Sequence, residues 1–122
     1  MALATPSTVT KPLPSNQAVV SLVSLSQNQR EAGKLDAAAA TLERALRVDP
    51  RNAELWYQLA ELRFAQSRSN QAIQLAVKSN TFAVADRSLQ AKNWQLIGRV
   101  KEKNGDSAGA QDAYGRANSL EP

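Results

Sequence analysis

Two segments of this chain repeat one arrangement of large and small residues. Residues 53–61 (AELWYQLAE) and 91–99 (AKNWQLIGR) both contain Trp, two further residues, Leu or Ile, and then Ala or Gly. Each Trp is followed sixteen residues later by Ala, and Leu22 begins a weaker copy with the same distance to Ala38. The three copies begin 34 and 38 residues apart. Such a period is typical of stacked helix–turn–helix units, each of which buries its apolar face only against its neighbours.

The three copies can be compared position by position. The first contains Leu22, Leu25, Ser26, Gln29, Gly33, Ala38, Leu42, Ala45 and Asp49-Pro50; the second contains Trp56, Leu59, Ala60, Arg63, Ser67, Ala72, Ala76 and Ser79; the third contains Trp94, Ile97, Gly98, Lys101, Gly105, Ala110, Tyr114, Ala117 and Glu121-Pro122. This pattern resembles the tetratricopeptide repeat (TPR) family, in which Trp-x2-Leu-Gly-x2-Tyr is followed by Ala-x3-Phe and then Pro. The second half of the second copy departs most from that pattern. The resemblance implies an all-α, right-handed superhelical stack of three helix–turn–helix repeats, about six helices, with repeats at about 19–52, 53–90 and 91–122.

Apolar periods and capping residues predict where the helices begin and end. The predicted helices span residues 17–31, 35–48, 53–66, 70–80, 87–104 and 107–119, with N-caps at Asn52, Ser69, Asp86 and Asp106. Gly33 and Gly105 are predicted to end helices, because glycine adopts left-handed dihedrals without a steric penalty. Gly98 is predicted to allow two helices to cross closely.

The four extra residues of the longer period lie within residues 77–91. Four residues make about one helical turn. Either the fifth helix therefore begins one turn early, at Asp86, or the preceding helix or loop is longer. Phe82 and Val84 are predicted to cover the apolar seam between the second and third repeats.

Residues 1–16 (MALATPSTVTKPLPSN) differ in composition from the rest of the chain. They hold three of the five prolines and no acidic residue, which predicts a flexible Pro/Ser/Thr-rich linker ahead of a TPR domain at 17–122. No stretch is apolar enough for a secretion signal or a membrane span. The tether and the Trp motifs are similar to those of small bacterial periplasmic, outer-membrane TPR lipoproteins, which implies an envelope location and a lipid anchor upstream of this chain. The cytoplasm is the alternative, because Met1 could be the native start or replace a removed segment.

The composition argues against catalysis. The chain has no Cys and no His, which removes thiolate nucleophiles, the commonest general base and the commonest metal ligands. Its carboxylates are spread over predicted helix surfaces, and Gly105-Asp-Ser-Ala-Gly109 lacks the lysine of a phosphate-binding loop. We therefore expect no enzyme activity, no catalytic residue, no metal site and no cofactor.

The net charge of +4 is concentrated in the middle of the chain. Residues 63–103 carry a net charge of +6, whereas residues 1–62 are neutral and residues 104–122 carry −2. Nucleic acid is therefore an alternative partner, because clustered Lys and Arg attract phosphates. The opposing interpretation, which we favour, is that Arg63 and Lys101 cover the seam between helices with their alkyl stems.

Protein binding is the function that the family resemblance implies. TPR stacks receive an extended peptide or a partner helix in a concave groove lined by the first helix of each repeat. The residues that the resemblance places in this groove are Gln27, Arg30, Tyr57, Gln58, Glu61, Phe64, Lys92, Gln95 and Arg99, with Val20, Val23, Glu54 and Glu102 beside them. The positions where some relatives hold a C-terminal carboxylate read Val23, Gln27, Gln58, Lys92 and Leu96, of which only Lys92 matches. That type of clamp is therefore not expected.

Tyr57 and Phe64 are the most informative members of this set. They lie seven residues apart, hence on one helical face, away from the face of Trp56 and Leu59. Tyr57 is expected to be exposed, whereas for Phe64 binding a partner and packing on the neighbouring repeat stay open.

Self-association is the alternative to peptide capture. The chain ends without the extra helix that covers the last repeat in many relatives, so a homodimer could form through the outer face of the last helix. The residues assigned to that face are Ala108, Ala113, Tyr114, Ala117 and Leu120.

Overall fold

The computed structural model describes residues 15–121, which form helices joined by short turns. Within this range the six helices are α2 (Ser15–Glu31), α3 (Leu35–Val48), α4 (Ala53–Ala65), α5 (Ser69–Phe82), α6 (Arg87–Lys103) and α7 (Ser107–Leu120). Each predicted boundary lies within two residues of the observed one. The predicted all-α stack is therefore confirmed. The linker prediction concerns mainly residues 1–14, which lie outside the described residues, and its last two residues belong to α2.

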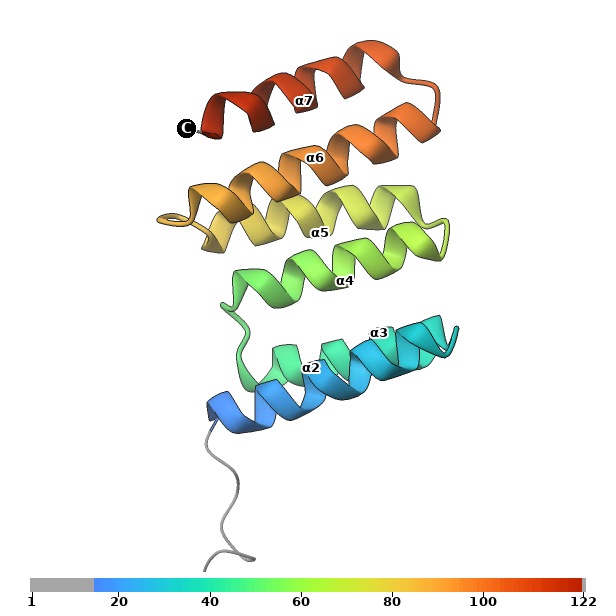
Figure 1. Ribbon diagram of the computed structural model, residues 1–122, viewed down its shortest axis with the longest axis vertical. Coiled ribbons are helices and arrows are strands. Elements are labelled where there is room, and N and C mark those ends of the chain that lie inside the picture. Colours follow the sequence, from blue (N-terminus) through green and yellow to red (C-terminus); the bar gives the residue numbers. More distant parts are fainter. Residues whose placement is uncertain (1–14, 122) are drawn as a thin grey trace, which may run out of the picture.

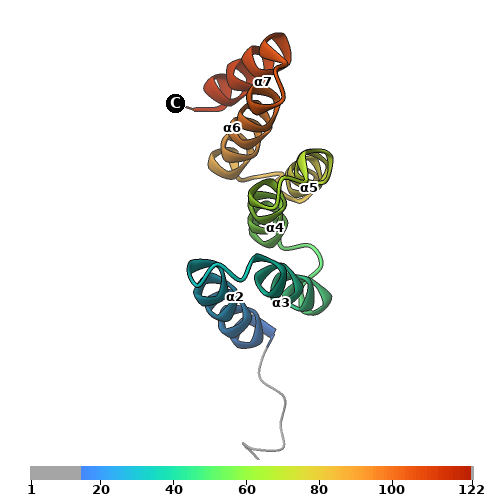
Figure 2. The ribbon, with the colours of Figure 1, turned by 90° about the vertical axis from the view of Figure 1, so that its right-hand side faces the viewer.

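The helices form three antiparallel hairpins stacked along one axis (Figure 1). Viewed from the side, α2, α4 and α6 lie on one side of the stack and α3 and α5 on the other (Figure 2). The backbones of α3 and α5 do not approach each other closely, and each packs instead against the first helix of the next hairpin. None of the described helices is both long and apolar enough to cross a lipid bilayer.

The turns within the three hairpins share one backbone geometry. Gly33, Ser67 and Gly105 adopt left-handed φ values of 79°, 63° and 84°. In each turn the next residue donates its N–H to the carbonyl five residues earlier, at 2.8 Å for Lys34 and Arg68 and 2.9 Å for Asp106. This pattern satisfies the free carbonyls at a helix end. The prediction that Gly33 and Gly105 end helices is thus confirmed, and Ser67 takes the same role in the second repeat.

Three of the four predicted N-caps are confirmed. Asn52 accepts hydrogen bonds from the N–H groups of Glu54 and Leu55, and the side chains of Asp86 and Asp106 each accept one from the third residue of the following helix. The prediction for Ser69 is wrong. The turn that follows Ser67 leaves Arg68 at the cap position, and Ser69 becomes the first residue of α5.

The four extra residues form one additional turn at the start of α6. This helix begins seven residues before Trp94, whereas α4 begins three residues before Trp56. The first of the two alternatives, an early start after Asp86, is therefore the one that the chain adopts.

The prediction for Phe82 and Val84 is wrong. Phe82 stacks on Trp56 with ring centroids 6.5 Å apart, so it closes the second repeat rather than the seam to the third. Val84 is 82% exposed. Ala83, between them in the sequence, is buried at the end of α5, where the chain turns.

The core consists of two apolar clusters that share α4. Leu55, Leu59 and Leu62 of α4 pack with residues of α2 and α3, whereas Ala60 packs with residues of α5, α6 and α7. Because α4 is buried on two sides, its apolar residues do not form a single stripe.

A buried polar chain adds to the contacts between hairpins. Asn93 of α6 is fully buried and donates to Ser79 Oγ at 2.8 Å, and Ser79 Oγ donates to the carbonyl of Ala53 at 2.7 Å. These bonds fix α4, α5 and α6 in one register.

Candidate functional site

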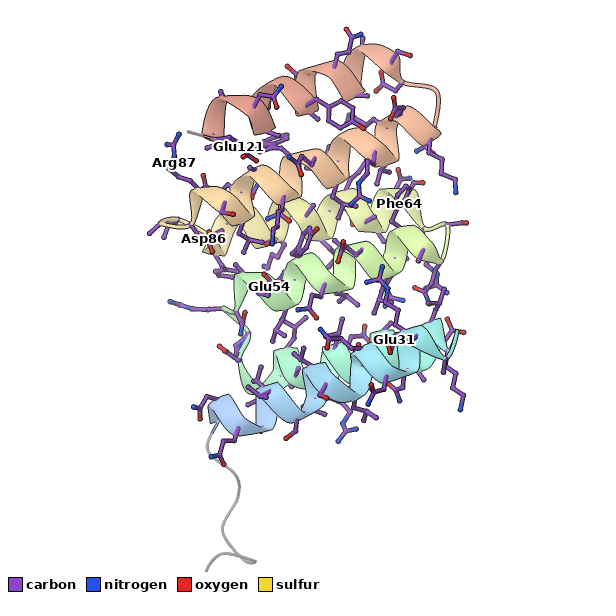
Figure 3. All side chains as sticks on the ribbon, in the orientation of Figure 1. Glu31, Glu54, Phe64, Asp86, Arg87 and Glu121 are labelled. Carbon is purple, nitrogen blue, oxygen red and sulfur yellow. The ribbon has the colours of Figure 1, made fainter. Side chains whose placement is uncertain are left out.

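The nine residues predicted to line the groove all lie on α2, α4 and α6, the three helices on one side of the stack (Figure 2). We call this side the first-helix face. Gln27, Arg30, Lys92, Gln95 and Arg99 are exposed, whereas Tyr57, Gln58, Glu61 and Phe64 of α4 are only partly exposed. In Figure 3, Glu54 and Phe64 mark the two ends of α4. The central helix therefore forms the floor of the surface, and α2 and α6 supply its accessible side chains.

Glu61 is the centre of the polar contacts on this face. Its carboxylate lies 3.7 Å from Arg30 Nη1 of α2 and 4.0 Å from Arg99 Nη2 of α6, and it accepts a hydrogen bond of 3.0 Å from the Tyr57 hydroxyl. The two arginine side chains remain 44% and 50% exposed. Two guanidinium groups around one carboxylate keep exposed N–H donors that a further anionic group can reach.

The environment of Tyr57 also changes its acidity. Burial, followed by the charge of Glu61 and its hydrogen bond, raises the pKa of Tyr57 from 10.0 to about 12. The phenol therefore stays protonated and donates to Glu61 throughout the neutral range.

Tyr57 and Phe64 do not project as free aromatic anchors. Both pack against the cluster formed by Ala60, Ala72, Leu96 and their neighbours, so the expectation of an exposed Tyr57 is wrong. Lys103 lies 5.6 Å from the centroid of the Phe64 ring and covers it further. The cause is the close approach of α6 to α4, which a sequence pattern within one repeat does not reveal.

A small polar pocket of about 190 Å³ opens on the first-helix face between α2 and α4. Four of the predicted residues line it, namely Gln27, Arg30, Gln58 and Glu61. Glutamine amides both donate and accept hydrogen bonds, which suits the backbone of an extended peptide.

A larger groove of about 580 Å³, which sequence reasoning missed, lies on the opposite side of the stack. We call it the α3–α5 groove, because α3 and α5 form its walls and α4 its floor. Its apolar lining comprises Leu46, Trp56, Leu59 and Leu75, and Arg47 and Lys78 flank one end. These residues come from three helices, so no single stretch of sequence indicated the groove.

The basic residues of the middle segment do not gather on one surface. Three of them pair with carboxylates (Arg63 with Glu43, Arg99 with Glu61, Lys101 with Asp106), and Lys78 and Lys103 lie over aromatic rings. Arg63 is only 14% exposed, as expected for a stem that covers a seam. Positive charge is thus divided between both sides of the stack, with Arg99 on one and Lys78 on the other.

The outer face of α7 differs from its prediction. Ala113 and Ala117 are buried against the rest of the stack, and Tyr114 packs on Gly98. The exposed residues include Gln111, Asp112, Gly115, Arg116, Asn118 and Ser119. The expectation is therefore wrong for Ala113 and Ala117, because these small residues let α7 approach α6. Ala108 is exposed and Leu120 partly exposed.

Comparison with known proteins agrees with this architecture. The profile of the TPR repeat family matches residues 29–67, and that of the tetratricopeptide repeat matches residues 91–122. The globular C-terminal domain of LpoP from P. aeruginosa is 42% identical, with a TM-score of 0.80 over 82% of this chain and 94% of that domain. The chain belongs to the tetratricopeptide repeat family. Comparison with the curated proteins finds no significant match.

Two further TPR structures share the fold at lower identity. The N-terminal domain of stress-induced protein-1 (STI-1) from C. elegans is 20% identical, with a TM-score of 0.80 over 89% of this chain and 88% of that domain. The second TPR of Spaghetti (RPAP3), bound to the HSP90 peptide SRMEEVD, is 19% identical, with a TM-score of 0.74 over 86% of this chain and 94% of that one. TPR domains are in general protein-interaction modules, and membership of the family supports that class of function for this chain.

Proposed function

We propose that this TPR domain is an interaction scaffold of the bacterial envelope that receives an extended segment of a partner protein on its first-helix face. The observation that carries the proposal is the convergence of Arg30, Glu61 and Arg99 from three successive repeats on one point. A partner carboxylate placed there would interact with both guanidinium groups, and Glu61 would hold them in position.

The polar side chains around this point suit an extended backbone. Gln27 and Gln95 are exposed on either side of α4, and Gln58 already donates to Glu54 at 3.2 Å within the floor. Because Tyr57 and Phe64 are partly buried in the core, apolar anchoring is weak here. Charge and hydrogen bonds therefore set orientation and association rate.

Site-specific photo-crosslinking tests the proposal. A photoreactive amino acid replaces, one at a time, three exposed glutamines on different surfaces: Gln95 on the first-helix face, Gln74 in the α3–α5 groove and Gln111 on α7. We expect a partner protein to crosslink from position 95 in cells and the crosslink to be lost in Arg30→Glu/Arg99→Glu. Crosslinks from position 74 or 111 alone, or a crosslink at 95 that survives the double charge reversal, would contradict the proposal.

The envelope location is supported by the Pro/Ser/Thr-rich composition of residues 1–16, the lack of cysteine and the 42% identity to a domain of a P. aeruginosa protein. Expression of the complete gene in its native host, followed by separation of cytoplasm, periplasm and membranes, tests it. We expect the protein in the outer-membrane fraction, with a lipid anchor detectable by labelling with a fatty-acid analogue. Recovery in the cytoplasm would refute the location and leave the interaction surface unaffected.

A further inference from the structure

The α3–α5 groove is a wide, mainly apolar concavity, and the first-helix face does not use it. Leu46 and Leu59 lie at its base, 7% and 3% exposed, while Trp56 and Leu75 are partly exposed beside them. A volume of about 580 Å³ falls within the range in which proteins bind ligands, about 300–1,000 Å³.

The charges around the groove are not symmetric. At one end Arg63 pairs with Glu43 at 3.2 Å, which leaves no net charge. At the other end Arg47, in the last turn of α3, and Lys78 of α5 flank Trp56. The Lys78 ammonium lies 5.6 Å from the centroid of the Trp56 ring. An occupant is therefore expected to carry negative charge near Trp56 and apolar side chains along the remaining length.

The shape of the groove favours a helix. Its walls are two helices that run in the same direction and whose backbones stay apart (Figure 1). An extended segment would bring backbone N–H and C=O groups onto an apolar floor that offers no strand edge for them, whereas a helix satisfies these groups internally.

We propose that the α3–α5 groove binds an amphipathic helix of a partner protein whose N-terminal turn is acidic, with that turn beside Arg47 and Lys78. The bound helix lies antiparallel to α3 and α5, so its positive N-terminal end meets the negative C-terminal ends of both walls. Acidic residues in its first turn are favoured by the dipole of their own helix and by the positive charges of Arg47 and Lys78. Leucines or aromatics on its apolar face cover Leu46, Leu59 and Leu75.

Neither the end helices of the stack nor the sequence of residues 1–14 matches this occupant. The two end helices of the stack, α2 and α7, have no acidic residue in the first turn, and the sequence of residues 1–14 contains no acidic residue. The charge pattern therefore favours a different protein over a second copy.

A fluorescence titration tests this proposal. In Trp94→Phe, Trp56 is the one remaining tryptophan of the sequence and lies in the groove. The probe is an acetylated synthetic peptide of about 15 residues, long enough to form a helix, with glutamates in its first turn and leucines along one face. The control peptide has lysines in place of those glutamates. We expect the acidic peptide to shift Trp56 emission and the lysine peptide to bind at least about tenfold more weakly.

Reversal of the two positive charges tests whether they contact the acidic turn of the peptide. Arg47 and Lys78 are exposed, so Arg47→Glu/Lys78→Glu should keep the fold, which circular dichroism verifies. This variant should lose affinity for the acidic peptide at least about tenfold and gain affinity for the lysine peptide. Gln74→Glu, at an exposed lining position, should weaken binding of the acidic peptide without changing the core.

Several outcomes would overturn the proposal. The first is an unchanged Trp56 emission with the acidic peptide, and the second is equal binding of the two peptides. The third is a loss of affinity for the acidic peptide in Arg30→Glu/Arg99→Glu but not in the groove variant, Arg47→Glu/Lys78→Glu. A dimer in sedimentation that the groove variant abolishes would assign the groove to a second copy instead. Because the first-helix face is tested by crosslinking at Gln95, failure of either proposal leaves the other intact.

Discussion

At the scale of single residues, the contact between Gly98 and Tyr114 shows why a small side chain is required where α6 crosses α7. A Cβ atom on Gly98 would lie 2.5–2.9 Å from three atoms of the Tyr114 ring. Gly98→Leu should therefore lower the free energy of unfolding by about 1–3 kcal/mol, as overpacking typically does. Urea denaturation measures this change.

The matched control for that prediction lies on the facing helix. A Cβ on Gly115 of α7 would meet no atom within 4 Å, and the residue has an ordinary helical φ. Gly115→Ala should stabilise the domain by roughly 0.5–1 kcal/mol, because alanine is the better helix former. Equal effects of the two substitutions would show that Gly98 does not lie at a close contact between α6 and α7.

Tyr57 predicts a loss of stability at alkaline pH. Its pKa is 10.0 in an unfolded chain and about 12 in the fold, because burial and Glu61 disfavour the phenolate. Below pH 10 the phenol is protonated in both states. As the pH rises from about 10 to about 12, the unfolded state releases the proton while the folded state keeps it, so unfolding becomes more favourable.

Urea denaturation over this range should show a steeper decline for the parent protein than for Tyr57→Phe, which has no phenol to titrate. Parallel curves for the two proteins would mean that Tyr57 is not held in the protonated form.

At the scale of elements, the left-handed residue at position 67 is the site where sequence and geometry disagree. Gly33 and Gly105 occupy this position in the other hairpins, whereas Ser67 adopts φ 63° with a Cβ. Ser67→Gly should raise the free energy of unfolding by about 0.5–1 kcal/mol, since relief of strain exceeds the extra entropy of the unfolded chain. Urea denaturation measures this free energy. The control Ser67→Ala should change it little, because alanine also carries a Cβ. A stabilisation by alanine as large as that by glycine would show that Ser67 is not strained.

Much of each element could be predicted from local sequence, and the exceptions have local causes. Asn52, Asp86 and Asp106 were recognisable as caps because short polar side chains precede apolar periods. The prediction for Ser69 fails because Arg68, which occupies the cap position, has no capping side chain, whereas Ser69, the next residue, has one. The prediction for Phe82 fails because this residue packs on Trp56, twenty-six residues earlier in the chain.

At the scale of the molecule, the sequence could predict which helices form the first-helix face but not the depth of their side chains. Tyr57 and Phe64 share a helical face, as expected, yet α6 lies close enough to α4 to bury them partly. The α3–α5 groove could not be predicted either. It depends on the distance between two helices whose backbones stay apart, which a repeat pattern leaves undetermined.

The two apolar clusters that meet at α4 predict a single cooperative unfolding transition. Trp56 packs against the first cluster and Trp94 against the second, while Leu75 packs against both. Trp94→Phe and Trp56→Phe each leave one tryptophan as a reporter of one cluster. Because α4 contributes residues to both, loss of either cluster should remove support from the other, although repeat proteins can unfold unit by unit.

We therefore expect each single-tryptophan variant to give the same urea midpoint by fluorescence as by helical circular dichroism. The comparison is made within each variant, since either substitution can shift overall stability. A fluorescence midpoint below the circular dichroism midpoint in one variant would mean that its cluster unfolds first. In that case α4 would not couple the two halves, and the two interaction surfaces would rest on independently stable parts of the stack.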